Sequence, residues 1–509
     1  MDQQKRLDFL DGVKKKIDEV SDDAAKKLSA TKSVKLTAKA RLSLLFDEGT
    51  FVETGAWVKK RETGLPGDFG DYEGIVTGYG AVDGRLVFAF SQDFTRKSGA
   101  LSEAGIKKIL AVYSQAEKNG APVVSVFDSA GADVTEGIDA LAGYASVFAK
   151  ASTLSGVIPQ YAVVAGTAAG FASALAEIAD FVFIEKTNGK IFVGSPFVIK
   201  NKDANAGSET YNAEYAVKSG LAAKIADGED KLFAEVRTLI GYLPSNNLDE
   251  GVYIDADDDL NRKTDEIASL ISGGKYDIKK VIAAVADNGK FYEVYENYDV
   301  NIITGFIAVG HETVGVVATN PADGEGKVCP GALDKAARFV NVLDSFNIPV
   351  LTLVDSEGVI VSASAEKAQF PLYLAKLSAA YANATVPKIT LNIGKAYGAA
   401  YAALGSKGLG ADTVFAYPTA QISILAPDTA VELLYGDVIL KDKDPAAKRA
   451  ELISKWEVED SSPTEAAASG AIDAIIEPAQ TRQMIASSLL YLQSKRELRP
   501  AKKQNRFPL

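Results

Sequence analysis

Two kinds of small-residue segment in this sequence could stabilise negative charge with main-chain donors. One is a loop that follows an Asp-Ser pair, the other is a glycine- and alanine-rich segment that opens a helical pattern, and each occurs in both halves of the chain. N–H groups at a helix start have no intrahelical partner, and small side chains let an oxygen approach them. One donor from each segment can hold a thioester oxygen as it becomes an enolate. The candidate residues are Ser129, Ala130, Gly131, Ala132, Gly170 and Phe171, then Gly358, Gly398, Ala399, Ala400 and Tyr401.

Histidine chemistry has little support in the composition. The only histidine, His311, follows Gly310 between two apolar runs, which predicts a solvated hairpin turn rather than a catalytic base. A Ser–His–Asp triad would have to include it, and a zinc site of the usual kind has few ligands because Cys329 is the only cysteine. Main-chain donors need no histidine, so they agree with this composition.

A purely structural interpretation competes with the donor hypothesis. Glycine- and alanine-rich helix starts also occur where a helix packs tightly against a sheet, and one such segment alone carries little weight. Recurrence at the same place in both halves is what favours a donor site.

The two halves of the chain resemble each other in order, which predicts an internal duplication. The offset between matched segments is about 230 residues. An acidic stretch rich in turn residues, at 244–265, lies between the halves. We therefore expect two domains, residues 1–250 and 251–509. The matched pairs are 78–82 with 305–309, 99–101 with 331–333, 121–129 with 348–356, 166–170 with 394–398, and 219–222 with 469–472.

Each half alternates strand and helix patterns after an initial hairpin. In the first half we expect a helix at 102–116, strands at 123–127 and 161–165, and a small-residue helix at 168–178. Residues 1–45 are amphipathic and predict a helical arm. This alternation predicts an α/β fold with a mostly parallel sheet. Ligand sites of such sheets lie at the carboxyl ends of the strands, where the candidate donors occur.

Composition narrows the partners. The chain has 509 residues and a formal net charge of −12, which argues against non-specific nucleic-acid binding. We find no run of about 18 uncharged apolar residues and no signal-peptide pattern. We therefore expect a cytoplasmic protein that reaches a membrane only through a partner.

At the candidate segments the sequence resembles a known family, the carboxyltransferase subunits of biotin-dependent acyl-CoA enzymes. These include the propionyl-CoA carboxylase β chain, the large transcarboxylase subunit and the methylmalonyl-CoA decarboxylase α subunit. The resemblance covers nearly the whole chain. The stretches that carry it include Leu36-Thr37-Ala38-Lys39-Ala40-Arg41, Ser91-Gln92-Asp93-Phe94-Thr95, Asn301-Ile302-Ile303-Thr304-Gly305 and Lys395-Ala396-Tyr397-Gly398.

The resemblance implies two tandem crotonase-like lobes with separate ligands. The first lobe (1–250) would hold the acyl-CoA through the N–H groups of Gly170 and Phe171, with Ser129, Ala130, Gly131 and Ala132 alongside. The second lobe (251–509) would hold biotin from a separate carrier protein through Ala399 and Ala400, with Gly358, Gly398 and Tyr401. A ring-like homo-hexamer is implied, with a biotin carboxylase or a membrane decarboxylase subunit as a further partner.

The sequence departs from the family pattern at several of these positions. Phe171 stands where the resemblance implies a second glycine, and Asp133 stands where it implies an arginine. The segment 357–362 lacks the expected prolines, and a Gly-Gly-Ala-x-x-His stretch is missing between Lys200 and Ser219. The scaffold therefore matches better than the site.

Three functions remain open on the sequence. The first is an active carboxyltransferase with an altered acyl-CoA pocket, and the second is a non-catalytic paralogue that serves as a structural partner. The third is another crotonase-type reaction, hydration or hydrolysis of a CoA thioester. Its candidate bases are the acidic pairs Glu177/Asp180 and Asp133/Glu136, which read more simply as solvated or capping carboxylates.

Overall fold

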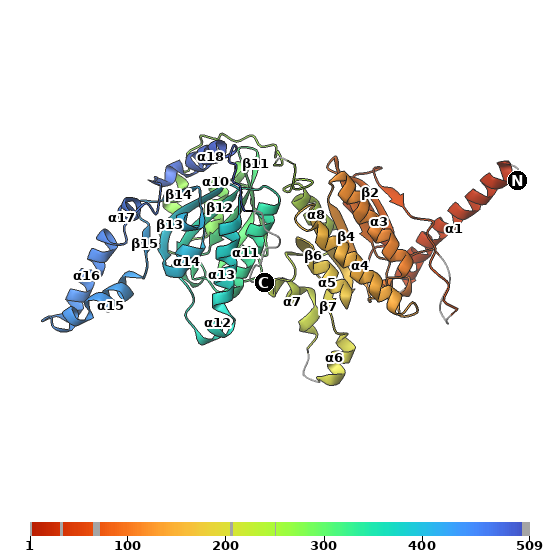
Figure 1. The fold of residues 1–509 in the computed structure, drawn as a ribbon, viewed down its shortest axis with the longest axis horizontal. Helices are drawn as coiled ribbons and strands as arrows, with labels where there is room; N and C mark the ends of the chain where they lie inside the picture. Colours follow the sequence, from red (N-terminus) through yellow and green to blue (C-terminus); the bar gives the residue numbers. More distant parts are fainter. Residues whose placement is uncertain (1–2, 31–33, 65–71, 204–206, 250, 501–509) are drawn as a thin grey trace. The chain divides into compact units, whose positions relative to one another are not determined.

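A computed structural model describes residues 3–30, 34–64, 72–203, 207–249 and 251–500. The chain divides into two compact units, Met1–Glu250 and Gly251–Leu509, called here the first and the second lobe. Each lobe is built on one eight-stranded sheet (Figure 1).

The sheet of the first lobe has the order β1-β2-β3-β4-β5-β6-β8, with β7 paired to the end of β5. Strands β1 to β3 are antiparallel, and the strands from β3 onward are parallel. Strands β4 and β6 are buried along their whole length, as expected for parallel strands covered on both faces. The strands are β1 (Val52–Thr54), β2 (Val76–Val82), β3 (Arg85–Ser91), β4 (Val123–Ser129), β5 (Gln160–Ala169), β6 (Phe181–Glu185), β7 (Lys190–Phe192) and β8 (Lys224–Ala226).

The second lobe repeats this sheet in the order β9-β10-β11-β12-β13-β14-β16, with β15 paired to the end of β13. Its first three strands are again antiparallel and the rest parallel. The strands are β9 (Tyr292–Val294), β10 (Ile302–Val309), β11 (Glu312–Thr319), β12 (Val350–Ser356), β13 (Lys388–Tyr397), β14 (Thr413–Ala416), β15 (Gln421–Ser423) and β16 (Ala474–Ile475).

Helices cover these sheets because each presents an apolar side to them. Helix α3 begins where the Ser102 hydroxyl accepts the N–H of Gly105 and ends at Gly120, which has the left-handed conformation of a helix C-terminus. In the first lobe α3 packs beside α4, and in the second α11 packs beside α13 (Figure 1). The helices are α1 (Gln3–Ala30), α2 (Ala38–Leu45), α3 (Glu103–Asn119), α4 (Ile138–Leu154), α5 (Phe171–Glu177), α6 (Pro196–Lys202), α7 (Ala213–Lys218), α8 (Glu229–Ile240), α9 (Glu266–Ile271), α10 (Ile278–Val285), α11 (Pro330–Ser345), α12 (Ala363–Lys367), α13 (Phe370–Asn383), α14 (Gly398–Ala403), α15 (Pro427–Leu440), α16 (Pro445–Glu459), α17 (Pro463–Ala468) and α18 (Thr481–Leu492).

One predicted pairing between the halves is wrong in register. Gly331 does not correspond to Gly99, because it lies inside the first turn of α11. The partner of Gly99 is Gly326: both end a short 3₁₀ helix with φ near +70°. A Cβ at either position would collide with the carbonyl oxygen of the strand-end aspartate, Asp128 or Asp355. A backbone contact, not helix initiation, therefore explains this repeated glycine.

The hairpin turn of each lobe is held by an aspartate and by an arginine from the last helix of that lobe. Asp47 accepts the N–H groups of Asp83 and Gly84, and Arg237 of α8 contacts it at 2.7 Å. In the second lobe Asp287 accepts the N–H groups of Gly310 and His311. Arg482 of α18 donates to it at 2.5 Å.

His311 occupies the predicted turn but is only partly solvated. Its ring stacks on Tyr253 with centroids 4.8 Å apart, and its Nδ1 lies 3.2 Å from the carbonyl oxygen of Ile254. None of the helices in the described ranges is both long enough and apolar enough to cross a membrane.

Candidate active site: main-chain donors at two strand ends

The loop after β4 leaves one outward N–H group in the first lobe. The N–H of Ala130 donates to the Ser98 carbonyl at 2.9 Å, and the N–H of Gly131 donates to the Ser129 hydroxyl at 3.1 Å. The N–H of Asp133 donates to the Leu101 carbonyl at 2.9 Å. Between them, the N–H of Ala132 has no hydrogen-bond partner among the residues that the structure describes.

The loop after β12 repeats this pattern in the second lobe. Glu357 donates its N–H to the Glu325 carbonyl at 3.2 Å, and Gly358 donates to the Ser356 hydroxyl at 3.1 Å. Ile360 donates to the Val328 carbonyl at 2.9 Å. Within the described part of the chain, the N–H of Val359 is left without a partner, as the N–H of Ala132 is in the first lobe. The free donor of each loop is therefore the residue directly before the one whose N–H donates to the Leu101 or the Val328 carbonyl.

The second donor of the first lobe is Phe171, the later residue of the predicted pair Gly170 and Phe171. Strand β5 runs to Ala169, beyond the predicted 165, because β7 pairs with its end. The N–H of Gly170 is consequently engaged by the Phe192 carbonyl at 2.9 Å. Helix α5 begins at Phe171, whose N–H lacks a partner in the described structure. Gly170 has φ +60°, which places the turn but not a free donor.

At the same corner in the second lobe, the free N–H belongs to the earlier residue of the predicted pair Ala399 and Ala400. Gly398 has φ +58° and corresponds to Gly170, so Ala399 corresponds to Phe171. Ala399 is exposed and its N–H has no partner among the described residues. Ala400 corresponds to the fully buried Ala172 and is itself fully buried. Ala399, rather than Ala400, is thus the outward residue of this corner.

The loop and the helix corner of each lobe adjoin. A Cβ added at Gly131 would lie 3.6 Å from the carbonyl oxygen of Ala169, and one added at Gly358 would lie 3.6 Å from that of Tyr397. Both corners reach the surface, because the Phe171 side chain is 39% exposed and Ala399 is exposed. Each lobe therefore has, on two adjoining segments at the carboxyl ends of its parallel strands, two N–H groups without a partner in the described structure.

A buried aspartate supports the first pair of donors. The carboxylate of Asp128, at the end of β4, accepts the N–H of Thr167 at 3.2 Å and ion-pairs with Lys35 and Arg41, each at 3.0 Å. Arg41 also contacts Glu229 at 2.7 Å. Burial acts to lower the pKa of Arg41, but Glu229 and Asp128 outweigh it and raise that pKa. Gly166 is required beside this carboxylate, because any Cβ there would overlap Asp128.

In the second lobe the corresponding carboxylate has a neutral partner. Asp355 accepts the N–H of Lys395 at 2.9 Å and the hydroxyl of Tyr276 at 2.8 Å. Burial raises the pKa of Asp355, and burial together with the charge of Asp355 raises the pKa of the Tyr276 phenol. The hydroxyl thus solvates this carboxylate where the first lobe uses two cations.

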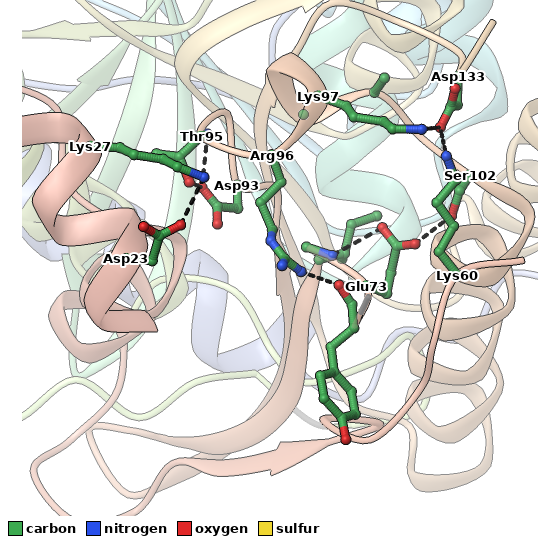
Figure 2. A pocket seen from close by; sticks show the side chains of 15 residues that line it. Asp23, Lys27, Lys60, Glu73, Asp93, Thr95, Arg96, Lys97, Ser102 and Asp133 are labelled. Atoms are coloured by element: carbon green, nitrogen blue, oxygen red, sulfur yellow. Dashed lines mark hydrogen bonds and ion pairs between the residues drawn. The ribbon is translucent and has the colours of Figure 1, made fainter. Parts of the chain in front are cut away.

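The first lobe also contains a cavity of about 360 Å³ that was not predicted from the sequence. Its lining includes four basic side chains (Lys27, Lys60, Arg96 and Lys97) and four carboxylates (Asp23, Glu73, Asp93 and Asp133), all of which are labelled in Figure 2. The adjacent basic pair after the Ser91–Thr95 segment was the only signal for it. Lys60 is separated by 73 residues from Asp133, its partner in the cavity, and no local pattern could indicate that contact.

Asp133 lines this cavity and is not the bare negative charge that the sequence suggested. Lys60 contacts its carboxylate closely, and Lys97 lies 3.4 Å away. Burial acts to raise the pKa of Asp133, but hydrogen bonds from Lys60 and Thr135 lower it to about 2. A carboxylate held in its ionised form by lysines is a poor general base.

Two of the other acidic candidates, Glu136 and Asp180, also have structural roles. Glu136 accepts the N–H of Glu103 at 2.6 Å, at the start of α3. Asp180 accepts the N–H of Gln160 at 2.8 Å, at the amino end of β5 and thus at the sheet edge opposite the donors. Burial raises the pKa of Asp180 to about 7, but its position removes it from the donor corners. No observation therefore favours hydration or hydrolysis.

Beside the second pair of donors lies a groove of about 590 Å³. Gly398, Ala399 and the half-buried Tyr401 line it, as do Ile422 and Ile424 from the segment around β15. Burial raises the pKa of the Tyr401 phenol. Over the described ranges, no group of three or more His, Cys, Asp or Glu side chains is placed to hold a metal ion.

Comparison with known proteins agrees with this arrangement. Residues 30–507 match the model of the carboxyl transferase domain. The methylmalonyl-CoA decarboxylase subunit alpha of Veillonella parvula is 40% identical over 93% of this chain and 93% of its own length. The propionyl-CoA carboxylase carboxyltransferase subunit of Haloferax mediterranei is 38% identical over 93% of this chain and 94% of its own.

The fold also matches a solved structure over its full length. The crystal structure of transcarboxylase 12S, a hexamer with methylmalonyl-coenzyme A bound, superimposes with a TM-score of 0.95 and 36% identity, covering 100% of this chain and 99% of that one. The predicted tandem crotonase-like fold is thereby confirmed. With two lobes of this fold and a family match that spans nearly all of its residues, the chain belongs to the carboxyl transferase domain family.

Proposed function

We propose that this chain is the carboxyltransferase subunit of a biotin-dependent acyl-CoA enzyme. It moves a carboxyl group between an acyl-CoA of the propionyl or methylmalonyl type and biotin on a separate carrier protein. The observation that carries this proposal is the pair of unpartnered, outward N–H groups in each lobe, Ala132 with Phe171 and Val359 with Ala399. Family membership gives these donors a reaction in which two carbonyl oxygens gain negative charge.

In the decarboxylating direction, the bond between Cα and the carboxyl carbon breaks and its electron pair moves toward the thioester. The thioester oxygen becomes an enolate oxygen, and the N–H groups of Ala132 and Phe171 donate to it. Carrier-bound biotin would supply a ureido nitrogen able to accept the CO2 and to give up its proton to Cα. The N–H groups of Val359 and Ala399 donate to the ureido oxygen as the nitrogen is deprotonated. Donors already fixed by the fold stabilise such charge without reorganisation.

The assignment of acyl-CoA to the first lobe and biotin to the second has two supports. The first is the resemblance of the sequence, which implies it. The open groove beside Ala399 suits a bicyclic ureido group delivered from outside. The boundary at residues 250 and 251 would then separate two binding functions.

Assembly is part of the proposal. Transcarboxylase 12S forms a hexamer, and we expect this chain to form one too. Native mass spectrometry of the purified protein measures this directly. A biotin carrier is the required partner, a biotin carboxylase or a membrane decarboxylase subunit is the further one, and the cytoplasm is the expected location.

A second candidate is a non-catalytic paralogue that fills a structural place in such a complex. It is favoured by one observation, the phenylalanine at the first-lobe corner, where the second lobe has only the methyl group of Ala399. The two candidates differ in turnover and not in fold.

The decisive experiment measures CO2 release from methylmalonyl-CoA by the purified protein with and without free biotin. Biotin-dependent release supports the carboxyltransferase. Ala399→Pro removes one N–H where proline fits a first helical turn, and kcat should fall about 10² to 10³-fold. Ala399→Ser keeps the N–H and should stay within a few-fold of the parent. Absence of turnover together with absence of CoA-thioester binding by calorimetry would establish the paralogue.

A further inference from the structure

The side chain of Phe171 is fixed beside the first pair of donors. Its ring meets Tyr144 with centroids 6.2 Å apart and Phe148 with centroids 5.6 Å apart, both edge to face. Both partners lie on α4, so the ring packs against that helix. It remains 39% exposed, and its open part faces away from these contacts. Two aromatic contacts of this kind hold a ring in place.

The same aromatic group also touches the loop that supplies the other donor. The hydroxyl of Tyr144 lies 3.4 Å from the carbonyl oxygen of Gly131, the residue before Ala132. The three rings therefore connect the loop to the helix corner. Movement of the Phe171 ring would disturb both, so the ring acts as a rigid wall and not as a gate.

This wall is apolar. Ile138 and Leu141 lie in the first turn of α4, and Leu141 precedes Phe148 by seven residues, which places Leu141 on the same side of the helix. They are 73% and 48% exposed. An acyl substituent that meets this surface is favoured if it is an alkyl group and disfavoured if it carries a charge.

The second lobe has no such wall. The residue that corresponds to Phe171 is Ala399, and the space beside it is open to the groove lined by Gly398 and Tyr401. The two corners share a glycine with φ near +60°, and at the residue after it one has a phenyl ring where the other has a methyl group. This contrast separates the donor role of the N–H from the role of the ring.

We infer that Phe171 is a specificity-determining residue that restricts the substrate to acyl-CoA thioesters with a short alkyl acyl group, no longer than propionyl. The inference rests on the proposed function. The N–H of Phe171 serves the enolate oxygen, while its ring occupies the space that a longer alkyl group on Cα would need. A pocket that lacks room for one methylene discriminates by about 10- to 200-fold, and a rigid ring cannot relax to admit it.

The test uses a series of malonyl-CoA thioesters that carry methyl, ethyl or propyl on Cα, with free biotin. In Phe171→Ala we expect kcat/KM for the ethyl substrate, relative to the methyl substrate, to rise at least tenfold. Phe171→Leu, which keeps bulk but loses the ring contacts, should fall between. Phe9→Ala removes an exposed phenylalanine that precedes the residues matched by the family model, and it should leave the ratio unchanged.

The possible outcomes separate this inference from the proposed function. Turnover of the methyl substrate by the parent with an unchanged ethyl-to-methyl ratio in Phe171→Ala overturns the inference alone. Parent turnover of the propyl substrate as fast as the methyl substrate also overturns it. No biotin-dependent turnover of any thioester by a folded parent overturns both.

Discussion

The two strand-end aspartates, Asp128 and Asp355, show how far two lobes can diverge around one backbone. Each carboxylate accepts an N–H from the next strand, and each sits against a glycine that has no room for a Cβ. Asp128 is neutralised by two cations, while Asp355 is hydrogen-bonded by a phenol. Both lobes therefore keep the aspartate that binds this backbone N–H, whereas the groups that compensate its charge differ between them.

The strongest way to break this comparison is to remove Arg41. Its guanidinium is 1% exposed and connects two carboxylates, Asp128 and Glu229. Arg41→Met would leave both buried with Lys35 as the remaining cation at Asp128. We expect the free energy of unfolding of the first lobe to fall by about 3–5 kcal/mol. Urea denaturation followed by the fluorescence of Trp57, in a Trp456→Phe background, measures it.

The outcome for the second lobe gives the control. Trp456 lies in the second lobe, so a Trp57→Phe background reports on that lobe instead. Arg41→Met should leave this second transition unchanged. A loss of less than 1 kcal/mol in the first lobe would show that water solvates the two carboxylates and that the buried ion pairs are not required.

A second comparison concerns the amino ends of the same sheets. Asp180 and Asp412 accept the N–H of Gln160 and Lys388 respectively, each at 2.8 Å. Asp412 also pairs with Lys495 at 2.8 Å, whereas burial without a cation raises the pKa of Asp180 to about 7. The stability that Asp180 contributes is therefore complete below its unfolded pKa near 4 and is lost as pH rises through about 7.

Asp180→Asn should accordingly stabilise the first lobe more at pH 8 than at pH 5. The difference between the two pH values has an upper bound of about 4 kcal/mol, from a shift of about three units. Denaturation at both pH values measures it. Asp412→Asn deletes the ion pair with Lys495 and should lower stability at both. An equal effect of Asp180→Asn at pH 5 and pH 8 would contradict the raised pKa.

A feature of the fold or of the candidate site could be predicted from the sequence where it depends on residues close together along the chain, and not where it depends on distant ones. The duplication, the strand at Val123 and the small-residue helix corners follow from local patterns, and their places in the fold are confirmed. The register of Gly99 could not be found locally, because its cause is a backbone contact with Asp128. The pairing of Arg41 with Glu229 spans 188 residues and has no local signature.

At each helix corner one residue of the predicted pair has the free N–H group, Phe171 in the first lobe and Ala399 in the second. The sequence shows a glycine at the corner but not that β7 returns to engage the N–H of Gly170 through Phe192. Ala132 is among the residues predicted from the sequence, whereas Val359 is not, because only the hydrogen bonds of Gly358 and Ile360 show that its N–H has no partner in the described structure. Asp133 read as a reversed charge because its partner Lys60 is distant in sequence.

The smallest expected effect sharpens the first comparison. Tyr276→Phe removes one hydrogen bond to Asp355 and leaves the N–H of Lys395 in place. We expect a loss of about 1 kcal/mol in the second lobe, measured by urea denaturation with Trp456 as the reporter. Tyr276→Leu also removes the ring and should cost more. A loss as large as that of Arg41→Met would mean that the phenol is as indispensable as the two cations.

In each lobe an arginine of the last helix, Arg237 or Arg482, contacts the aspartate that holds the hairpin turn, and this has a consequence for biosynthesis. A nascent chain lacks Arg237 and Glu229 until it nears the end of the first 250 residues. Until then the first hairpin turn lacks Arg237, and Arg41 has Asp128 but not Glu229 as a charged partner. Each lobe can close only when its final helix has left the ribosome, so the first lobe matures while the second is still being translated.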